Sequence, residues 1–197
     1  MELALFDFDH TVTTADSYRR FLRRVATPEQ RARAWWLVGP WLAAFRLRLI
    51  SAERIRARVT ALVFSGRHAD DIALLAAGYA RDALPEMMRP EMLEQIRWHQ
   101  AQGHTVAIVS ASLDLYLRPW CDQLGLQLIC NQLENREGRL TGRYAGGDCG
   151  PRKAQHIRQR FDLSRYTRIH AYGDSCEDAP MLALAHDRWY RGKPLER

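Results

Sequence analysis

The stretch "LALFDFDHTVTTADS" at residues 3–17 decides the fold of this 197-residue chain. Its first four residues, from Leu3 to Phe6, are apolar and predict a short buried strand. Two aspartates, Asp7 and Asp9, follow one residue apart, where the strand ends. A carboxylate buried without a partner is costly or takes up a proton. We therefore expect the pair to lie at a functional site beyond the strand rather than inside a core.

The composition is typical of a globular protein with an anionic partner. Hydrophobic residues make up 47% of the chain, and its length suits one domain with an insertion or two small domains. The net charge of +6 does not distinguish nucleic acid, lipid head group and phosphorylated metabolite. Four scattered cysteines without a CxxC pair argue against a zinc ribbon and indicate reduced thiols. With neither a leader-like start nor a membrane-spanning run, we expect a cytoplasmic protein, with peripheral contact at the inner face of the membrane left open.

From about residue 85 onward, predicted helices and strands alternate along the chain. Such alternation implies right-handed parallel crossovers and an α/β fold with a three-layer, Rossmann-like parallel sheet. We expect helices at 90–104, 114–125 (interrupted near Pro119), 150–161 and 177–185, strands at 105–112, 126–132, 167–174 and 188–190, and a hairpin at 133–143.

Polar residues stand where three of the predicted strands end. They are Asp7 and Asp9, Ser110 in "IVSAS", and Asp174 in "AYGDS". Ligands bind beyond the carboxyl ends of the strands in such sheets, and the helix that carries Lys153 brings an ammonium group to the same edge. Carboxylates gathered there repel each other unless a cation neutralises them, and carboxylate oxygens with water suit Mg²⁺. We therefore predict a magnesium site at this edge.

A metal site of this kind also admits a phosphate dianion. The hydroxyl and backbone amides near Ser110 can bind phosphate oxygens, and Lys153 supplies a positive charge. A carboxylate beside Mg²⁺ can attack the phosphoryl group and form an aspartyl-phosphate. The second acid, two residues on, can protonate the leaving oxygen and then deprotonate the attacking water. The pattern predicts hydrolysis of a phosphomonoester.

Four motifs carry a family resemblance: "DFDHT" (7–11), "SAS" (110–112), Lys153 in "GPRKAQHI" and "GDSCED" (173–178). In this order they resemble the motifs of the haloacid dehalogenase superfamily over nearly the whole chain. An acid at position 9, absent from the dehalogenases and replaced by threonine in transport ATPases, is typical of the family's phosphatases. The resemblance implies the following site residues: catalytic Asp7 and Asp9; phosphate-binding Ser110, Ala111 and Lys153; metal-binding Asp7, Asp9 (through its backbone carbonyl) and Asp174; supporting Asp178 and Thr11.

The segment between the first motif and residue 85 resembles the family's inserted cap. We predict an all-helical cap (C1 type) at 15–84 that closes over the site, and a catalytic core at 1–14 and 85–197. The cap segment holds 13 arginines, no lysine and six acids, a net charge of +7. The basic character of the chain therefore belongs to the cap.

One part of this cap, "AWWLVGPWLAAF" (34–45), has no charge and three tryptophans. It is too short to span a bilayer. One interpretation is a helix hairpin broken at Gly39-Pro40, with its tryptophans packed on neighbouring helices. The other is a helix that lies on anionic membrane and admits a lipid phosphate, since tryptophan with flanking arginine suits the interface. The flanking arginines are Arg31, Arg33, Arg46 and Arg48.

The overall layout resembles subfamily IB, which includes phosphoserine phosphatases and phosphatidylglycerophosphatases of the C type. The tryptophan- and arginine-rich cap favours a substrate like phosphatidylglycerophosphate, with phosphoserine or another small metabolite as the alternative. Asp16 stands where a phosphoserine phosphatase has a substrate-contacting glutamate, and Ala111 departs from the usual double glycine. Arg56 and Arg58 are candidate substrate-binding arginines by position. Glu177 stands where related phosphoserine phosphatases often have asparagine.

Two non-enzymatic classes of protein would explain part of this pattern. A receiver domain also holds an aspartyl-phosphate with Mg²⁺, but it lacks the 70-residue insertion and the acid at Asp9. A nucleic-acid-binding module would explain the arginines but leaves the aspartates without a purpose, so we expect no nucleic-acid partner. Apart from His10, the histidines show no ligand spacing, which predicts structural roles for them.

Overall fold

The fold is built around a six-stranded sheet. The computed structural model describes residues 1–47 and 49–195, apart from the side chains of Trp35, Ala43 and Arg46; Arg48, one of the flanking arginines, lies outside these residues. The strands are β1 (Glu2–Phe6), β2 (Thr105–Leu113), β3 (Gln127–Asn131), β6 (Arg168–Gly173), β7 (Asp187–Tyr190) and β8 (Lys193–Pro194), with a separate hairpin of β4 (Leu133–Arg136) and β5 (Arg139–Tyr144). The sheet order is β3-β2-β1-β6-β7-β8, parallel except for the final pair.

Helices cover both faces of this sheet. Alternate residues of β1 face opposite sides, so Leu3 and Leu5 join one buried cluster while Ala4 and Phe6 join the other. The helices are α5 (Pro90–Ala101) and α6 (Asp114–Gln123) on the Phe6 side, and α7 (Lys153–Arg160) and α8 (Ala179–Leu182) on the Leu5 side. The prediction of a three-layer α/β fold with a parallel sheet is confirmed.

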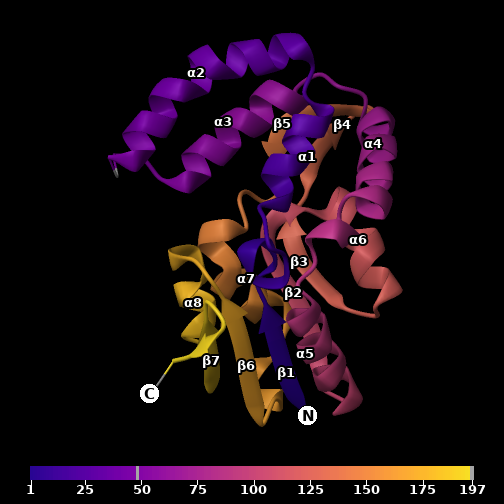
Figure 1. Ribbon diagram of the computed structural model, residues 1–197, viewed down its shortest axis with the longest axis vertical. Coiled ribbons are helices and arrows are strands. Elements are labelled where there is room, and N and C mark those ends of the chain that lie inside the picture. The colour runs from indigo at the N-terminus through magenta and orange to yellow at the C-terminus, as the bar shows by residue number, and fades with distance from the viewer. Residues whose placement is uncertain (48, 196–197) are drawn as a thin grey trace.

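Four helices fill most of the chain between β1 and α5. They are α1 (Ser17–Val25), α2 (Pro28–Arg46), α3 (Ala52–Phe64) and α4 (Ala69–Asp82). Figure 1 shows α2 and α3 extending from the upper end of the sheet, toward which β1 runs from the N-terminus. Helices α1 and α4 join the main core, because the ring of Phe21 lies 5.3 Å from Tyr79 and 5.0 Å from Tyr116 of α6. The end of α3 joins it too, through Val63 and Phe64. The insertion is thus anchored by its first and last helices and by the end of α3.

The β4–β5 hairpin packs against the insertion rather than against the main sheet. The Leu140 N–H donates to the Arg67 carbonyl over 2.9 Å, and the Gly66 N–H donates to the Leu140 carbonyl over 2.8 Å. Gly142 has φ +78°, and a Cβ there would lie 2.8 Å from the Cα of Ala61. Glycine at this position allows β5 to approach α3 closely. The hairpin and the outer helices therefore form one unit over the sheet.

Two predicted helix interruptions are absent. Helix α2 continues through Gly39 and Pro40, and α6 continues through Pro119. A proline inside a helix costs about 3 kcal/mol, because it removes a hydrogen bond and crowds the preceding turn. In α2, contacts on both sides of Pro40 offset that cost: Val38 is buried, and the Arg58 guanidinium of α3 lies 4.5 Å from the Trp41 ring centroid. The predicted helix hairpin within residues 34–45 is therefore absent, and α2 and α3 together form a helix hairpin instead.

The outer surface of α2 carries exposed apolar side chains. Trp36 is 79% exposed, so it does not pack on a neighbouring helix, whereas Trp41 is half-buried. Within residues 1–47 and 49–195, none of the helices combines the length and apolar character needed to cross a bilayer. The other exposed large apolar side chains in and just after α2 are Leu37, Leu42, Phe45, Leu47 and Leu49.

Candidate active site

The first two aspartates leave β1 in different directions. Asp7 continues the strand, because its N–H donates to the Tyr172 carbonyl of β6 over 2.9 Å, and its side chain is buried. The chain then turns sharply, with His10 in the left-handed region at φ 62°. The Asp9 carboxylate accepts hydrogen bonds from the Ser17 N–H at 2.6 Å and the Ser112 hydroxyl at 2.5 Å. Asp9 is therefore held between the start of α1 and the end of β2.

Lys153 joins two of the predicted site carboxylates. It is the first residue of α7, and its Nζ donates to Asp178 Oδ1 over 2.6 Å and to Asp7 Oδ1. All three side chains are buried. Lys153 is therefore a buried lysine rather than an ordinary exposed residue of a helix. A buried ammonium needs such anionic partners, since desolvation alone would favour its neutral form.

Asp178 is fully engaged by this network. Its Oδ2 accepts hydrogen bonds from the Asp174 N–H at 3.1 Å, the Ser175 N–H at 2.9 Å and the Ser175 hydroxyl at 2.8 Å. Burial acts to raise its pKa, but the Lys153 charge and these hydrogen bonds hold the pKa of Asp178 below its usual value. Asp178 is thus an ionised anchor for Lys153 and for the loop after β6.

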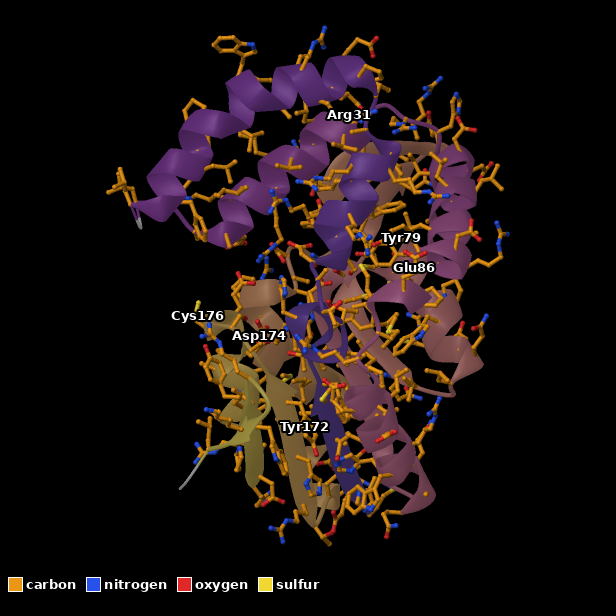
Figure 2. The ribbon with its side chains drawn as sticks, in the orientation of Figure 1. Arg31, Tyr79, Glu86, Tyr172, Asp174 and Cys176 are labelled. Carbon is orange, nitrogen blue, oxygen red and sulfur yellow. The ribbon has the colours of Figure 1, made fainter. Side chains whose placement is uncertain are left out.

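Asp7 and Asp174 behave differently from Asp178. Burial raises the pKa of Asp7 to about 7, against the opposing effect of Lys153. Burial and the nearby charge of Asp178 also raise the pKa of Asp174, which is half-buried at the upper end of β6 (Figure 2). Both carboxyls therefore favour a proton, or another cation, in the folded chain. The burial of Lys153 acts to lower its pKa, but Asp7 and Asp178 more than offset this and raise it.

The arrangement of oxygen atoms fits a hard divalent cation. One carboxylate oxygen from each of Asp7, Asp174 and Asp178 lies within 4.8 Å of the others. Oxygen-only donors suit Mg²⁺, which usually takes one or two carboxylates and keeps several waters. Because both oxygens of Asp178 already accept hydrogen bonds, Asp7 and Asp174 are the carboxylates best placed to bind the ion directly.

The end of β2 offers groups for a phosphate. The register with β3 shifts between Val109 and Leu113, which releases the Ser110–Ser112 segment from regular pairing. Ser110 Oγ accepts the Ser112 N–H at 3.0 Å, so its own hydroxyl hydrogen is left to donate to a ligand. The Ala111 carbonyl accepts from the Asn131 side chain at 2.7 Å, which holds the segment in place.

A buried hydroxyl and a cavity adjoin these groups. Thr11 Oγ1 is buried, and no hydrogen-bond partner for it occurs in the described part of the chain. Buried polar atoms are normally paired, so this hydroxyl is suited to a ligand or an ordered water. A cavity of about 770 Å³ reaches Thr11 and Asp174 and is also lined by Arg89 and Arg191. An anionic ligand therefore has both room and positive charge beside the carboxylates.

An ion-pair cluster joins the insertion to the sheet edge. Arg56 of α3 donates to Asp148 Oδ2 and to Glu177 Oε1, each at 2.7 Å. Asp148, which precedes α7, also accepts the Gly150 N–H at 2.9 Å. Sequence reasoning named Arg56 but missed Asp148, because "GGDCG" (146–150) reads only as a polar loop.

The other two predicted cap residues lie in different surroundings. Arg58 faces α2, where its guanidinium covers the Trp41 ring. Asp16 caps α1, since its carboxylate accepts the Arg19 N–H at 2.7 Å. The structure thus brings Asp7, Lys153 and the acids after β6 together and does not bring Arg58 to them.

The chain is similar in sequence or fold to several known proteins. The chain is 32% identical to protein CicA of Caulobacter vibrioides, over 98% of this chain and 88% of that protein. A Bordetella pertussis protein of unknown function has a similar structure, with a TM-score of 0.79 and 26% identity over 95% of this chain and 88% of that one. A phosphoserine phosphatase, solved as a phospho-aspartyl intermediate analogue, shares the fold with a TM-score of 0.66 and 19% identity, over 94% of this chain and 84% of that one.

The family comparison covers most of the chain, up to the segment before β7. Residues 4–183 match the family model described as haloacid dehalogenase-like hydrolase. The match spans the segments that carry Asp7, Ser110, Lys153 and Asp174, and it confirms the prediction of an enzyme with a phosphatase-like fold. The chain therefore belongs to the haloacid dehalogenase-like hydrolase family.

Proposed function

We propose that this chain is a Mg²⁺-dependent phosphomonoester hydrolase that forms an aspartyl-phosphate on Asp7. The observation that carries the proposal is the buried Asp7–Lys153–Asp178 cluster beside Asp174, at the carboxyl ends of β1 and β6. A cation-neutralised carboxylate next to an anion-binding segment is the arrangement that phosphoryl transfer to a carboxylate requires.

In the first step, a carboxylate oxygen of Asp7 attacks phosphorus and the bond to the ester oxygen breaks. Asp9 gives its proton to the departing alkoxide, which leaves as an alcohol. Burial, together with the charge of Asp16, raises the pKa of Asp9 and so favours the protonated form that this step needs. Bound Mg²⁺ would neutralise charge on the phosphoryl oxygens, and Lys153 and Ser110 would orient them.

In the second step, Asp9 takes a proton from a water molecule, and the oxygen of that water attacks phosphorus. The bond between phosphorus and Asp7 breaks, which releases inorganic phosphate and restores the free carboxylate. The hydrogen bonds from Ser17 and Ser112 fix the Asp9 side chain through both steps. The insertion, held by Arg56, would limit the entry of other water molecules.

For the substrate, we propose a lipid phosphomonoester similar to phosphatidylglycerophosphate. The apolar side chains around α2, with Trp36, Leu47 and Leu49 the most exposed, suit peripheral contact with a membrane surface. Arginines supply the charge that attracts anionic lipid. Such contact would place residues 15–84 as a cap between the bilayer and the carboxylates, with the protein on the cytoplasmic side.

Phosphoserine is the second candidate substrate. It is favoured by the fold shared with a phosphoserine phosphatase and by Arg56, a cationic group next to the site. It is disfavoured by Asp16, whose carboxylate caps α1. Both candidates use the same phosphoryl chemistry, so the substrate can be tested separately from the reaction.

The experiment has two stages. Hydrolysis of para-nitrophenyl phosphate is measured after EDTA treatment and after Mg²⁺ is restored, for the parent and for Asp7→Asn. We expect activity only with Mg²⁺ and only in the parent; metal-independent activity, or activity in Asp7→Asn, would disprove the mechanism. Initial rates are then compared for phosphatidylglycerophosphate in vesicles and for phosphoserine. A preference for phosphoserine would reject the lipid substrate while leaving the mechanism intact.

Vesicle binding tests the proposed membrane contact directly. We expect co-sedimentation with vesicles that contain an anionic phospholipid, and weaker binding when Trp36→Ala and Leu47→Ala are combined. The matched control is Leu74→Ala, which removes an apolar side chain that is 77% exposed on α4. Equal binding by the two variants would refute a role for α2.

A further inference from the structure

Three histidines converge at the other end of the sheet, away from the carboxylates. His99 lies near the end of α5, His104 directly before β2, and His170 within β6. One ring nitrogen from each lies within 4.8 Å of the others. Figure 2 shows Tyr172 farther down β6 than Asp174, and the Tyr172 hydroxyl contacts His99 of this cluster. No regular spacing in the sequence connects them, because they come from three separate elements.

We propose that His99, His104 and His170 bind a divalent transition-metal ion, with Zn²⁺ the best match. Imidazole nitrogen suits Zn²⁺ and its neighbours in the transition series, whereas Mg²⁺ prefers oxygen. The Glu2 carboxylate supports the set from outside, since its Oε2 lies 2.7 Å from His170 Nε2 and 3.5 Å from His104 Nε2, on the edge of that ring away from His99. Three nitrogens and a water molecule form a four-coordinate set of the kind that zinc accepts.

The spacing of the rings favours one shared cation, because each ring places a nitrogen within 4.8 Å of the other two. His99 Nδ1 faces His104 Nδ1 at 2.8 Å, where two charged rings would repel each other. A single divalent ion satisfies all three rings at once.

Groups behind the histidines are suited to orient them as ligands. His99 Nε2 lies 2.9 Å from the Tyr172 hydroxyl, which holds the far side of that ring. His170 Nδ1 lies 3.1 Å from Asp187 Oδ2. These two atoms form no hydrogen bond, so the Tyr172 hydroxyl is the group that supports a ligand ring from behind.

The distances require only a small adjustment. At metal–ligand bonds of about 2.0–2.1 Å, a tetrahedral site separates its ligand atoms by about 3.3 Å. The Nδ1 atoms of His99 and His104 would therefore move apart by about 0.5 Å from their 2.8 Å separation. His104 and Glu2 are partly exposed and give an ion a path to the buried His99.

The test is Zn²⁺ binding by the untagged, EDTA-treated protein, followed by calorimetry and by metal analysis after dialysis. The matched pair of variants is His104→Ala, inside the cluster, and His68→Ala, an exposed histidine at the start of α4. We expect the parent and His68→Ala to retain one more equivalent of Zn²⁺ than His104→Ala, or to bind it at least about tenfold more tightly.

Two further measurements keep the proposal falsifiable if His104→Ala folds poorly. Glu2→Gln changes only the carboxylate near the chain start and should also weaken Zn²⁺ binding. Co²⁺ bound in place of Zn²⁺ should absorb visible light strongly, as tetrahedral nitrogen sites do, and this absorption should persist in Asp7→Asn. Equal stoichiometry and affinity in His104→Ala and His68→Ala, or a Co²⁺ spectrum typical of six oxygens, would overturn the proposal. Because every readout is binding, failure here leaves the proposed hydrolase activity untouched.

Discussion

The two ends of the same sheet present opposite chemistry. At the carboxyl ends of the strands, Asp7 follows β1 and Asp174 follows β6, and the available donors are oxygen atoms. At the amino ends, Glu2 begins β1 and His170 lies within β6, and the donors are mostly imidazole nitrogen. About five residues along each strand separate a site suited to a hard cation from one suited to a borderline transition metal.

The two ends of the sheet also differ in the elements that pack near them and in the direction in which burial shifts the pKa of their side chains. Arg56 of the insertion pairs with Asp148 and Glu177 near the carboxylates, and Figure 1 shows α2 and α3 beyond that end of the sheet. Burial favours a proton on Asp7 but disfavours one on His99, because desolvation always opposes the charged form. The comparison teaches that the donor atoms determine which cation each end prefers, while burial opposes the charged form of both Asp7 and His99.

The largest expected effect comes from Asp7→Asn. Losing the nucleophile should lower kcat by at least about 10⁴-fold, which is about 5.5 kcal/mol in activation free energy. Steady-state hydrolysis of para-nitrophenyl phosphate measures it, with Asp122→Asn, an exposed acid of α6, as the matched control. Zn²⁺ binding at the histidines should be unchanged. A parallel loss of Zn²⁺ binding would show that the two ends are not independent.

A second large effect is expected from Lys153→Met. Without the ammonium, Asp7 and Asp178 are buried carboxylates lacking their cation, and the free energy of unfolding in EDTA should fall by about 3–5 kcal/mol. We expect kcat to fall by about 10²–10³-fold as well, because a donor to the phosphoryl group is lost. Urea denaturation measures the stability, with the exposed Lys193→Met as control. Equal stability of the two variants would contradict the pairing.

The pH dependence of metal-free stability should separate the two ends. Folding raises the pKa of Asp7 from 3.8 to about 7, so the stability from this group is present at low pH and is lost as pH rises through 7. Folding lowers the pKa of His99 from 6.5 to about 4, so its contribution is present above pH 6.5 and is lost as pH falls toward 4. The contribution of His99 amounts to about 3 kcal/mol at 1.4 kcal/mol per pKa unit.

Single substitutions should therefore tilt the stability profile in opposite directions between pH 4 and 7. Asp7→Asn removes the loss of stability that Asp7 causes as pH rises, and only the gain from His99 remains. The free energy of unfolding of this variant should therefore rise with pH more steeply than that of the parent. His99→Gln should show the reverse, a flatter or falling profile. Thermal unfolding in EDTA at a series of pH values checks both. Two variants with the same slope would contradict the assignment of these protons.

The smallest effect is expected from Arg56→Ala, which tests whether Arg56 holds the insertion against the carboxyl ends of the strands. Losing the ion pairs to Asp148 and Glu177 should loosen the insertion and lower kcat/KM by about tenfold, or about 1.4 kcal/mol, mainly through KM. Arg54→Ala, an exposed arginine on the same helix, is the control. If both variants keep the parental kcat/KM, Arg56 does not hold the insertion against the carboxylate site.

Motif reasoning predicted the carboxylate end well, because each motif residue lies at the end of a regular element. A strand that ends at Asp7 and another that ends near Asp174 must bring those side chains to one edge of a parallel sheet. The same reasoning misjudged Pro40, since the burial of Val38 and the contact of Trp41 with Arg58 of α3 outweigh a local preference for a break. It missed Asp148, whose role depends on where the insertion folds back.

The sequence by itself determined the parallel α/β sheet, the four motifs and the excess of arginine in the insertion, because these follow from local periodicity and residue type. Only the tertiary structure determined which side chains are buried next to one another. It buried Lys153 between two acids and gathered His99, His104 and His170 from three elements. Burial and proximity across long stretches of chain set the pKa values and the donor sets, and no local pattern records them.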